Sequence, residues 1–251
     1  MNQRLTANLA SILTLAIAWE ILGRTLQTIL IPPVTHIGSA WLRLVNNGGL
    51  LENLTISLGT LLVGFFLALI LGVAIGVLMG TFEKVEYCLD LYINGLMASP
   101  TIAFIPVLIL WFGLGVQSRI AVVFLFSFFV IAVNTMTGIK YVDSSLVEMS
   151  RSFGAKGWEL FYKVQLPAAL PMIMAGVKLG VGRAVKGMVT GEVILALSGT
   201  GAMIMQYGSA FATDALFAII LTILAVALIA MKIVELIDRH LTGWKAGIAI
   251  E

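Results

Sequence analysis

The sequence predicts an all-α integral membrane protein that forms a single domain over residues 1–251. Hydrophobic residues make up 60% of the chain, charged residues only 11%, and the mean hydropathy is +1.05, values far outside those of soluble proteins. Six apolar runs are long enough to cross the hydrocarbon core as helices, and they lack the short alternating segments of a membrane β-barrel. They lie at approximately 6–23, 54–80, 88–112, 118–139, 168–197 and 214–237.

The first run, 6–23, admits a second interpretation as a secretory signal peptide. Arg4 precedes it, and the Ala-Ile-Ala sequence at 16–18 has the small residues of a cleavage site. In a protein with several spans, however, the first helix commonly serves as its own insertion signal. We therefore expect a retained span, with Glu20 near its external end in a structural role, and an even number of crossings.

The basic residues of the loops predict that both termini face the cytoplasm, because Lys and Arg accumulate on that side of a membrane. With the N-terminus inside, only Arg24, Arg43 and Arg119 lie outside, and 24–53 is the longest external segment. The loop 140–167 is then cytoplasmic. The net charge of +2 gives no indication of a nucleic-acid partner. The basic residues on or near the cytoplasmic face are Arg4, Lys84, Lys140, Arg151, Lys156, Lys163, Lys232, Arg239 and Lys245.

Glycines form rows in two of the predicted spans. Gly72, Gly76 and Gly80 fall on successive turns of the second span, so another helix backbone can approach closely there. Such a row suits either static packing or an interface along which helices slide. At about 100° per residue, four glycines of the fifth span lie within roughly 60° of its circumference. They are Gly176, Gly180, Gly187 and Gly191.

The fifth span also carries four ionisable residues. Lys178, Lys186 and Glu192 lie opposite the glycine stripe, with Arg183 between the two faces. Ionisable groups at membrane depth cost several kcal/mol unless they pair or contact water. These residues therefore either border a polar translocation pathway or form a scaffold in which Lys178 reaches the cytoplasmic surface and Glu192 pairs near the external end. The excess of cations favours an anionic solute.

Between the fourth and fifth runs, charged and turn residues predict two short helices outside the membrane. A helix over 146–153 follows Asp-Ser-Ser, which are good N-cap residues, and Gly154 can end it in a left-handed conformation. A second helix over 158–165 is expected to run until Pro167 and Pro171 break the chain before the fifth span. An element of this kind, rich in charges and aromatic residues, is suited to docking a partner.

Residues that could support catalysis or bind a metal are few. Cys88 is the single cysteine, which excludes a disulfide within the chain and a thiolate cluster. His36 and His240 lie in loops on opposite sides of the predicted membrane. The sequence contains no P-loop, HExxH or GxSxG motif. We therefore expect neither an enzyme nor a metal site.

The 140–167 loop resembles the "EAA" loop of permease subunits of bacterial ABC importers, because Glu148, Gly154 and Leu166-Pro167 occur in the order and spacing of that motif. Collinear similarity extends over about 30–205. It is similar to the branch that imports nitrate, taurine, alkanesulfonates, bicarbonate and related small solutes. The other segments that carry the resemblance are 31–33, 57–80, 99–115, 134–143 and 176–193.

The resemblance implies a type I importer permease fold with six helices per subunit, paired as a homodimer in the bacterial inner membrane. It also implies two ATPase subunits, which bind the ATP and Mg, and a periplasmic or lipid-anchored solute-binding protein. Glu148 would pair with a basic group of the ATPase, Gly154 would form the turn, and Pro167 would set the exit geometry. Met149 and Ser150 stand where the family usually has alanines. The residues assigned to ATPase coupling are Glu148, Met149, Ser150, Arg151, Gly154, Ala155, Leu166 and Pro167.

Two other classes of function are compatible with the composition. An autonomous carrier or channel would use the charged fifth span as an ion relay and would work without an ATPase. An intramembrane enzyme is disfavoured because the sequence shows no nucleophile and base constellation. The solute itself is not identified, since relatives in this branch also import neutral or cationic vitamin precursors.

Overall fold

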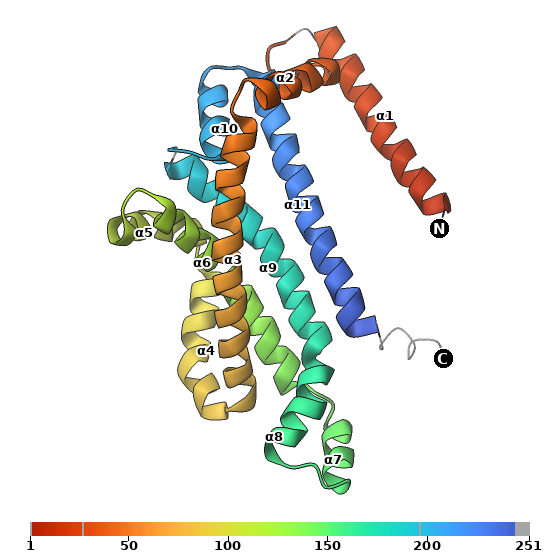
Figure 1. Ribbon diagram of the computed structural model, residues 1–251, viewed down its shortest axis with the longest axis vertical. Helices are drawn as coiled ribbons and strands as arrows, with labels where there is room; N and C mark the ends of the chain where they lie inside the picture. The colour runs from red at the N-terminus through yellow and green to blue at the C-terminus, as the bar shows by residue number, and fades with distance from the viewer. Residues whose placement is uncertain (1, 27, 196, 244–251) are drawn as a thin grey trace. The chain divides into compact units, whose positions relative to one another are not determined.

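The computed structural model describes residues 2–26, 28–195 and 197–243, which form helices joined by short turns, with no β-strand among them (Figure 1). The predicted all-α class is therefore confirmed. Lys245 lies outside the described residues. The helices are α1 (Asn2–Leu26), α2 (Val34–Asn46), α3 (Leu50–Thr81), α4 (Glu83–Ala98), the 3₁₀ turn η1 (Thr101–Phe104), α5 (Ile105–Phe112), α6 (Val116–Lys140), α7 (Ser144–Ser152), α8 (Gly157–Leu160), the π-helical turn η2 (Phe161–Gln165), α9 (Leu166–Leu195), α10 (Thr200–Ser209) and α11 (Thr213–Thr242).

Four of the described helices are long and apolar enough to cross a membrane, and they coincide with the second, fourth, fifth and sixth predicted runs. The bent pair formed by α4 and η1–α5 raises this number to five if it makes one span. Helix α1 coincides with the first predicted run, and its crossing remains a prediction. The four helices are Leu50–Thr81, Val116–Lys140, Gly157–Leu195 and Thr213–Thr242.

The predicted spanning run over 88–112 does not form one continuous helix. Helix α4 ends at Ala98, and the chain turns by 100° before η1 and α5 continue. Pro100 causes the break, because a proline has no N–H to donate and forces the preceding residue out of the helical region. Ser99 accordingly adopts extended angles, φ −72° and ψ 148°.

The predicted break at Pro167 and Pro171 is wrong. Gly157–Leu195 runs as one continuous helical segment, with Pro171 inside α9. The π-helical turn η2 precedes Pro167, and the amide of Leu166 donates to the carbonyl of Phe161, five residues back. This wider turn, together with neighbouring helices, accommodates prolines that would end an isolated helix.

The chain forms two compact units, Met1–Ser57 with Glu192–Ala225, and Leu58–Gly191 with Val226–Glu251. The long helices α3, α9 and α11 each contribute residues to both. In the first unit, the sequence did not lead us to expect α2, which lies within the predicted external segment 24–53 and packs the side chains of Ile37, Ala40 and Leu44 inward.

Helix α6 is the centre of the second unit, and both predicted glycine rows pack against it. A Cβ atom added to Gly76 of α3 would lie 2.5 Å from the carbonyl oxygen of Ala132 and from Cβ of Thr135. On α9, a Cβ atom at Gly176 would lie 2.6 Å from Cβ of Asn134. The absence of side chains at these positions therefore sets how closely the helices approach.

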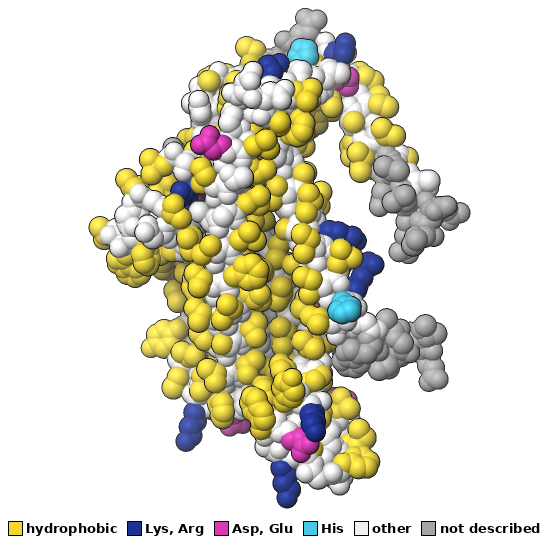
Figure 2. Space-filling view, in the orientation of Figure 1, with side chains coloured by type: hydrophobic (Ala, Val, Ile, Leu, Met, Phe, Trp, Pro, Cys, Tyr) yellow, Lys and Arg dark blue, Asp and Glu magenta, His cyan; other side chains and the backbone are white. Residues whose placement is uncertain are grey.

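Hydrophobic side chains cover most of the long helices on the face seen in Figure 2, and Lys, Arg, Asp and Glu side chains gather toward helix ends. On α11, for example, Leu224, Leu228 and Ile229 are each more than half exposed. Water would penalise apolar surface of this extent on a soluble protein, whereas lipid does not. The surface therefore agrees with the composition.

We expect Gly76→Ala to lower the free energy of unfolding by ~1–3 kcal/mol, because the added methyl group overpacks the contact between α3 and α6. Thermal unfolding of the detergent-solubilised protein measures this effect. Gly59→Ala is the matched control on the same helix, because nothing lies within 4 Å of a Cβ atom at that position. Equal midpoints for the two variants would contradict the close approach at Gly76.

Candidate functional site

The residues between α6 and α9 form a helical hairpin, and its first helix, α7, is capped at its N-terminus by Asp143. The carboxylate of Asp143 accepts a hydrogen bond from the backbone amide of Ser145 at 2.9 Å. Hydrogen bonds from the hydroxyl and amide of Ser145 lower the pKa of the Asp143 carboxyl group. The anionic form therefore persists at neutral pH, where it also interacts favourably with the N-terminus of α7.

Helix α7 ends in a Schellman motif centred on Gly154. The amide of Gly154 donates to the carbonyl of Arg151 at 2.9 Å, and the amide of Ala155 donates to the carbonyl of Ser150 at 3.0 Å. This pair of bonds requires a left-handed residue at the first position after the cap, and Gly154 has φ +92°. The helix end predicted at this glycine is present.

One side of α7 exposes a stripe of apolar side chains. Leu146, Met149 and Phe153 are 39%, 52% and 87% exposed, and at about 100° per residue they fall within roughly 60° of one another. Glu148, also exposed, lies on the opposite side of the helix. We call Leu146, Met149 and Phe153 the α7 stripe. Met149, which departs from the alanine of the EAA pattern, is a member of it.

The second arm of the hairpin adds an exposed aromatic group and an anchor. Trp158 is 75% exposed, and its ring centroid lies 5.4 Å from that of Phe161 and 6.4 Å from that of Tyr162. Phe161 and Leu166 pack against a cluster of buried residues that includes Ile173 and Val181 of α9. Leu166 and Pro167 are half-buried. The second arm of the hairpin is therefore packed against the cluster that α9 helps to form.

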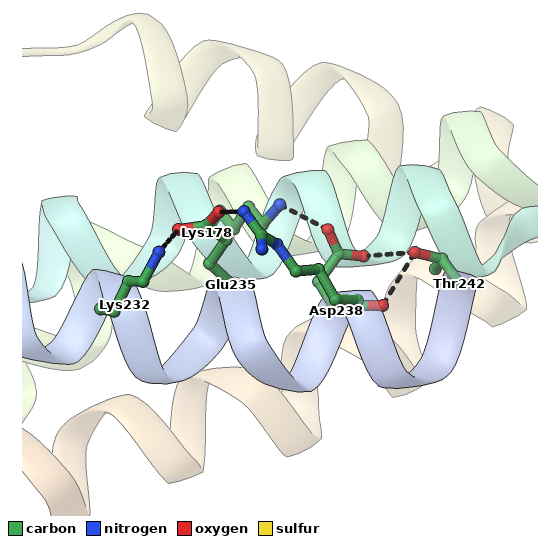
Figure 3. Close-up of polar contacts among 6 residues, drawn as sticks. Lys178, Lys232, Glu235, Asp238 and Thr242 are labelled. Carbon is green, nitrogen blue, oxygen red and sulfur yellow. Dashed lines mark hydrogen bonds and ion pairs between the residues drawn. The ribbon is translucent and has the colours of Figure 1, made fainter. Parts of the chain in front are cut away.

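Among the four ionisable residues of the fifth span, Lys178 pairs across to α11. Its ammonium group contacts the carboxylate of Asp238, which also accepts a hydrogen bond from Thr242 at 2.9 Å. Figure 3 shows this chain of contacts beside the ion pair of Lys232 with Glu235. The charge of Lys178 is thus compensated within the second unit, between α9 and α11.

Arg183 and Lys186 differ from Lys178, because both side chains are exposed and neither forms an ion pair within the described part of the chain. They lie three residues apart and so share one face of α9. Gly182 lies beside them with nothing within 4 Å of an added Cβ atom. This face of α9 is therefore open and cationic in a single copy of the chain.

Glu192, in the last turn of α9, is completely buried in the first unit. Its carboxylate lies at the N-terminus of α10. Its Oε2 accepts hydrogen bonds from Ser57 Oγ at 2.8 Å, the amide of Gly201 at 2.9 Å and Thr200 Oγ1 at 3.2 Å. A Cβ atom at Gly199 would lie 2.4 Å from the carboxyl carbon. The carboxylate therefore holds α3, α9 and the turn into α10 together.

Sequence reasoning singled out Glu192 but missed Ser57, Thr200 and the two glycines that surround it. The available signal was the Ser-Gly-Thr-Gly sequence at 198–201, where α10 begins, because small residues at the start of a helix allow its amides to surround an anion. Within residues 2–26, 28–195 and 197–243, no three His, Cys, Asp or Glu side chains form a group that could hold a metal ion. Cys88 is exposed.

The family described as "Binding-protein-dependent transport system inner membrane component" matches residues 68–243. The "Putative aliphatic sulfonates transport permease protein SsuC" of Bacillus subtilis is 36% identical over 230 residues, which cover 90% of this chain and 83% of that protein.

The names of two further relatives refer to other solutes. The taurine transport system permease protein TauC of Escherichia coli is 28% identical over 252 residues, which cover 97% of this chain and 91% of that protein. The formylaminopyrimidine transport permease protein ThiX of Halalkalibacterium halodurans is 29% identical over 234 residues, or 93% of each chain. The chain therefore belongs to the family of binding-protein-dependent transport system inner membrane components, the membrane permease subunits of ABC importers.

Proposed function

We propose that two copies of this permease subunit form the translocation pathway of an importer for a small anionic solute, with six spans per copy and both termini in the cytoplasm. Two ATPase subunits bind ATP and Mg on the cytoplasmic side. A solute-binding protein delivers the solute from outside, because the family depends on such a protein. The permease then alternates between outward and inward openings.

The observation that carries the coupling role is the α7 stripe. Two exposed apolar side chains of the nine-residue helix α7 and that of its C-cap residue Phe153 are unfavourable in water, and they lie outside the helices that are long enough to cross the membrane. A groove in a partner subunit would bury them, and Glu148 on the other side of α7 would pair with a basic group at its rim. We assign the hairpin over 140–167 to ATPase docking.

Coupling also requires that the docked element bias one state of the permease over the other, since equal binding to both states would shift nothing. Phe161 and Leu166 connect the hairpin to the buried cluster on α9. Movement of the ATPase subunits on ATP binding is therefore passed to α9, which packs against residues of α3, α6 and α11. Lys178, paired with Asp238, keeps α9 and α11 moving together.

The cationic face of α9 supports an anionic solute. Uncompensated Arg and Lys side chains at membrane depth cannot face lipid at low cost, so they are expected to face water, a second copy or the solute. Within one chain, the side chains of Arg183 and Lys186 are exposed, and neither forms an ion pair among the described residues. Sulfonates, which appear in the name of one relative, carry the matching charge. We propose that Arg183 and Lys186 contact the solute, and that Lys178 and Glu192 hold the surrounding helices.

Gly154→Val tests the docking hairpin. A β-branched residue in the left-handed region is strained by ~1–2 kcal/mol, while nothing lies within 4 Å of the added Cβ atom, so the change distorts the turn without causing a clash. We expect the variant to reach the membrane at a normal level, to lose copurifying ATPase and to lose ATP-driven uptake. Glu148→Arg should have the same effect through its charge.

Gly154→Asn is the control for the turn, because asparagine tolerates the left-handed conformation, and it should retain most of both activities. Normal copurification and uptake in Gly154→Val and Glu148→Arg would overturn the docking assignment. Uptake by the reconstituted permease without any ATPase would instead support an autonomous carrier.

Arg183→Glu and Lys186→Glu test the pathway. Reversal of either charge should raise KM for an alkanesulfonate by about tenfold or more through repulsion, with ATPase copurification intact. Lys84→Glu, which makes the same change of net charge at an exposed position of α4, should leave KM near the wild-type value. Unchanged kinetics in both α9 variants would assign Arg183 and Lys186 to the scaffold.

A further inference from the structure

Phe211, in the turn between α10 and α11, has an unusual backbone conformation. Among the described residues it is the one non-glycine residue with positive φ, at +55°. Its amide donates to the carbonyl of Gly208 at 3.1 Å, and the amide of Ala212 donates to the carbonyl of Tyr207 at 3.0 Å. These are the two bonds of a Schellman motif, so Phe211 occupies the position that glycine usually takes.

Gly154 ends α7 in the same motif and has the residue that the motif favours. Phe211 therefore carries a backbone strain that glycine would relieve. Burial of the ring does not compensate for this strain, because the side chain is 67% exposed. Strained, exposed residues of this kind are typical of functional surfaces, where the strain fixes the direction of a side chain.

The surroundings of Phe211 form an open cavity of about 650 Å³ within the first unit. The turn is held in place by Thr213, whose hydroxyl donates to the carbonyl of Ile29, and by the ion pair of Arg43 with Asp214 at 2.7 Å. The surface is therefore assembled before any partner arrives. Its lining includes Arg24, Ile29, Pro33, His36, Phe211 and Asp214.

Two guanidinium groups lie at or near this surface, and each already pairs with one carboxylate. Arg24 binds Glu20 through Nε at 2.6 Å, and Arg43 binds Asp214 through one terminal nitrogen. Their side chains nevertheless remain 65% and 64% exposed, so further N–H donors are available to the carboxylates of a partner. Phe211 and Arg24 line the same cavity, and aromatic and arginine side chains are enriched in protein–protein hot spots.

We propose that this surface, with Phe211 as its aromatic anchor, is where the solute-binding protein docks. The inference rests on the proposed function, because the predicted orientation places Arg24, Arg43 and the α10–α11 turn outside the cell. The family's dependence on a binding protein supplies a folded, water-soluble partner on that side. Acidic side chains of that protein would meet Arg24 and Arg43, and one of its apolar pockets would enclose Phe211.

The test uses the complete permease and ATPase complex in lipid nanodiscs, where both faces are accessible. ATPase activity is measured as the concentration of solute-loaded binding protein increases, and thermal unfolding is followed on the same samples. Phe211→Gly and Phe211→Asn both relieve the strain and remove the ring. We expect their unfolding midpoints to equal or exceed that of the wild type, while the binding-protein concentration for half-maximal stimulation rises by about tenfold.

Two controls separate the ring from the turn. Phe211→Tyr keeps an aromatic ring, and Ala210→Gly loosens the same turn but keeps Phe211; both should stay near the wild-type half-maximal concentration. An unchanged half-maximal concentration in Phe211→Gly and Phe211→Asn would overturn the docking site, as would a lowered unfolding midpoint in both. Failure of the wild-type complex to respond to binding protein at all would instead contradict the proposed function.

Discussion

Helix α6 meets the backbones of α3 and α9 at glycines, and in lipid this contact takes over the role that hydrophobic burial has in a soluble core. Lipid tails are as apolar as leucine, so helices associate through close van der Waals contact. The distance of 2.5 Å from an added Cβ atom at Gly76 to the carbonyl oxygen of Ala132 leaves no room for a side chain. The positions of the charged faces of α9 and of the hairpin that precedes it depend on this packing.

Both proposed contact surfaces are built at helix ends that use the same hydrogen-bond pattern. At Gly154 the motif has glycine, the residue that it favours, and it reverses the chain. The exposed side chains there are those of the α7 stripe, which precedes the turn. At Phe211 the residue at the turn is itself the exposed group, and the strain is the consequence. A shared backbone motif therefore presents a partner with either a helix face or a single ring, depending on which residue occupies one position.

Local patterns in the sequence predicted the features that depend on local chemistry. The apolar runs gave the long helices, the glycine spacing gave the face of α9 that packs on α6, and Gly154 gave the end of α7. The partners of Lys178 and Glu192 could not be predicted in this way, because Asp238 and Ser57 lie 60 and 135 residues away along the chain. Pro100 and Pro171 show the same limit, since one breaks a helix and the other is accommodated inside one, and only tertiary packing distinguishes them.

The π-helical turn ahead of α9 has a mechanical consequence. Pro167 and Pro171 each remove one backbone donor, and the amide of Leu166 reaches five residues back rather than four. Successive turns at this joint therefore lack some of the bonds that stiffen an ordinary helix. We therefore expect this continuous joint to bend more readily than an ordinary helix of the same length.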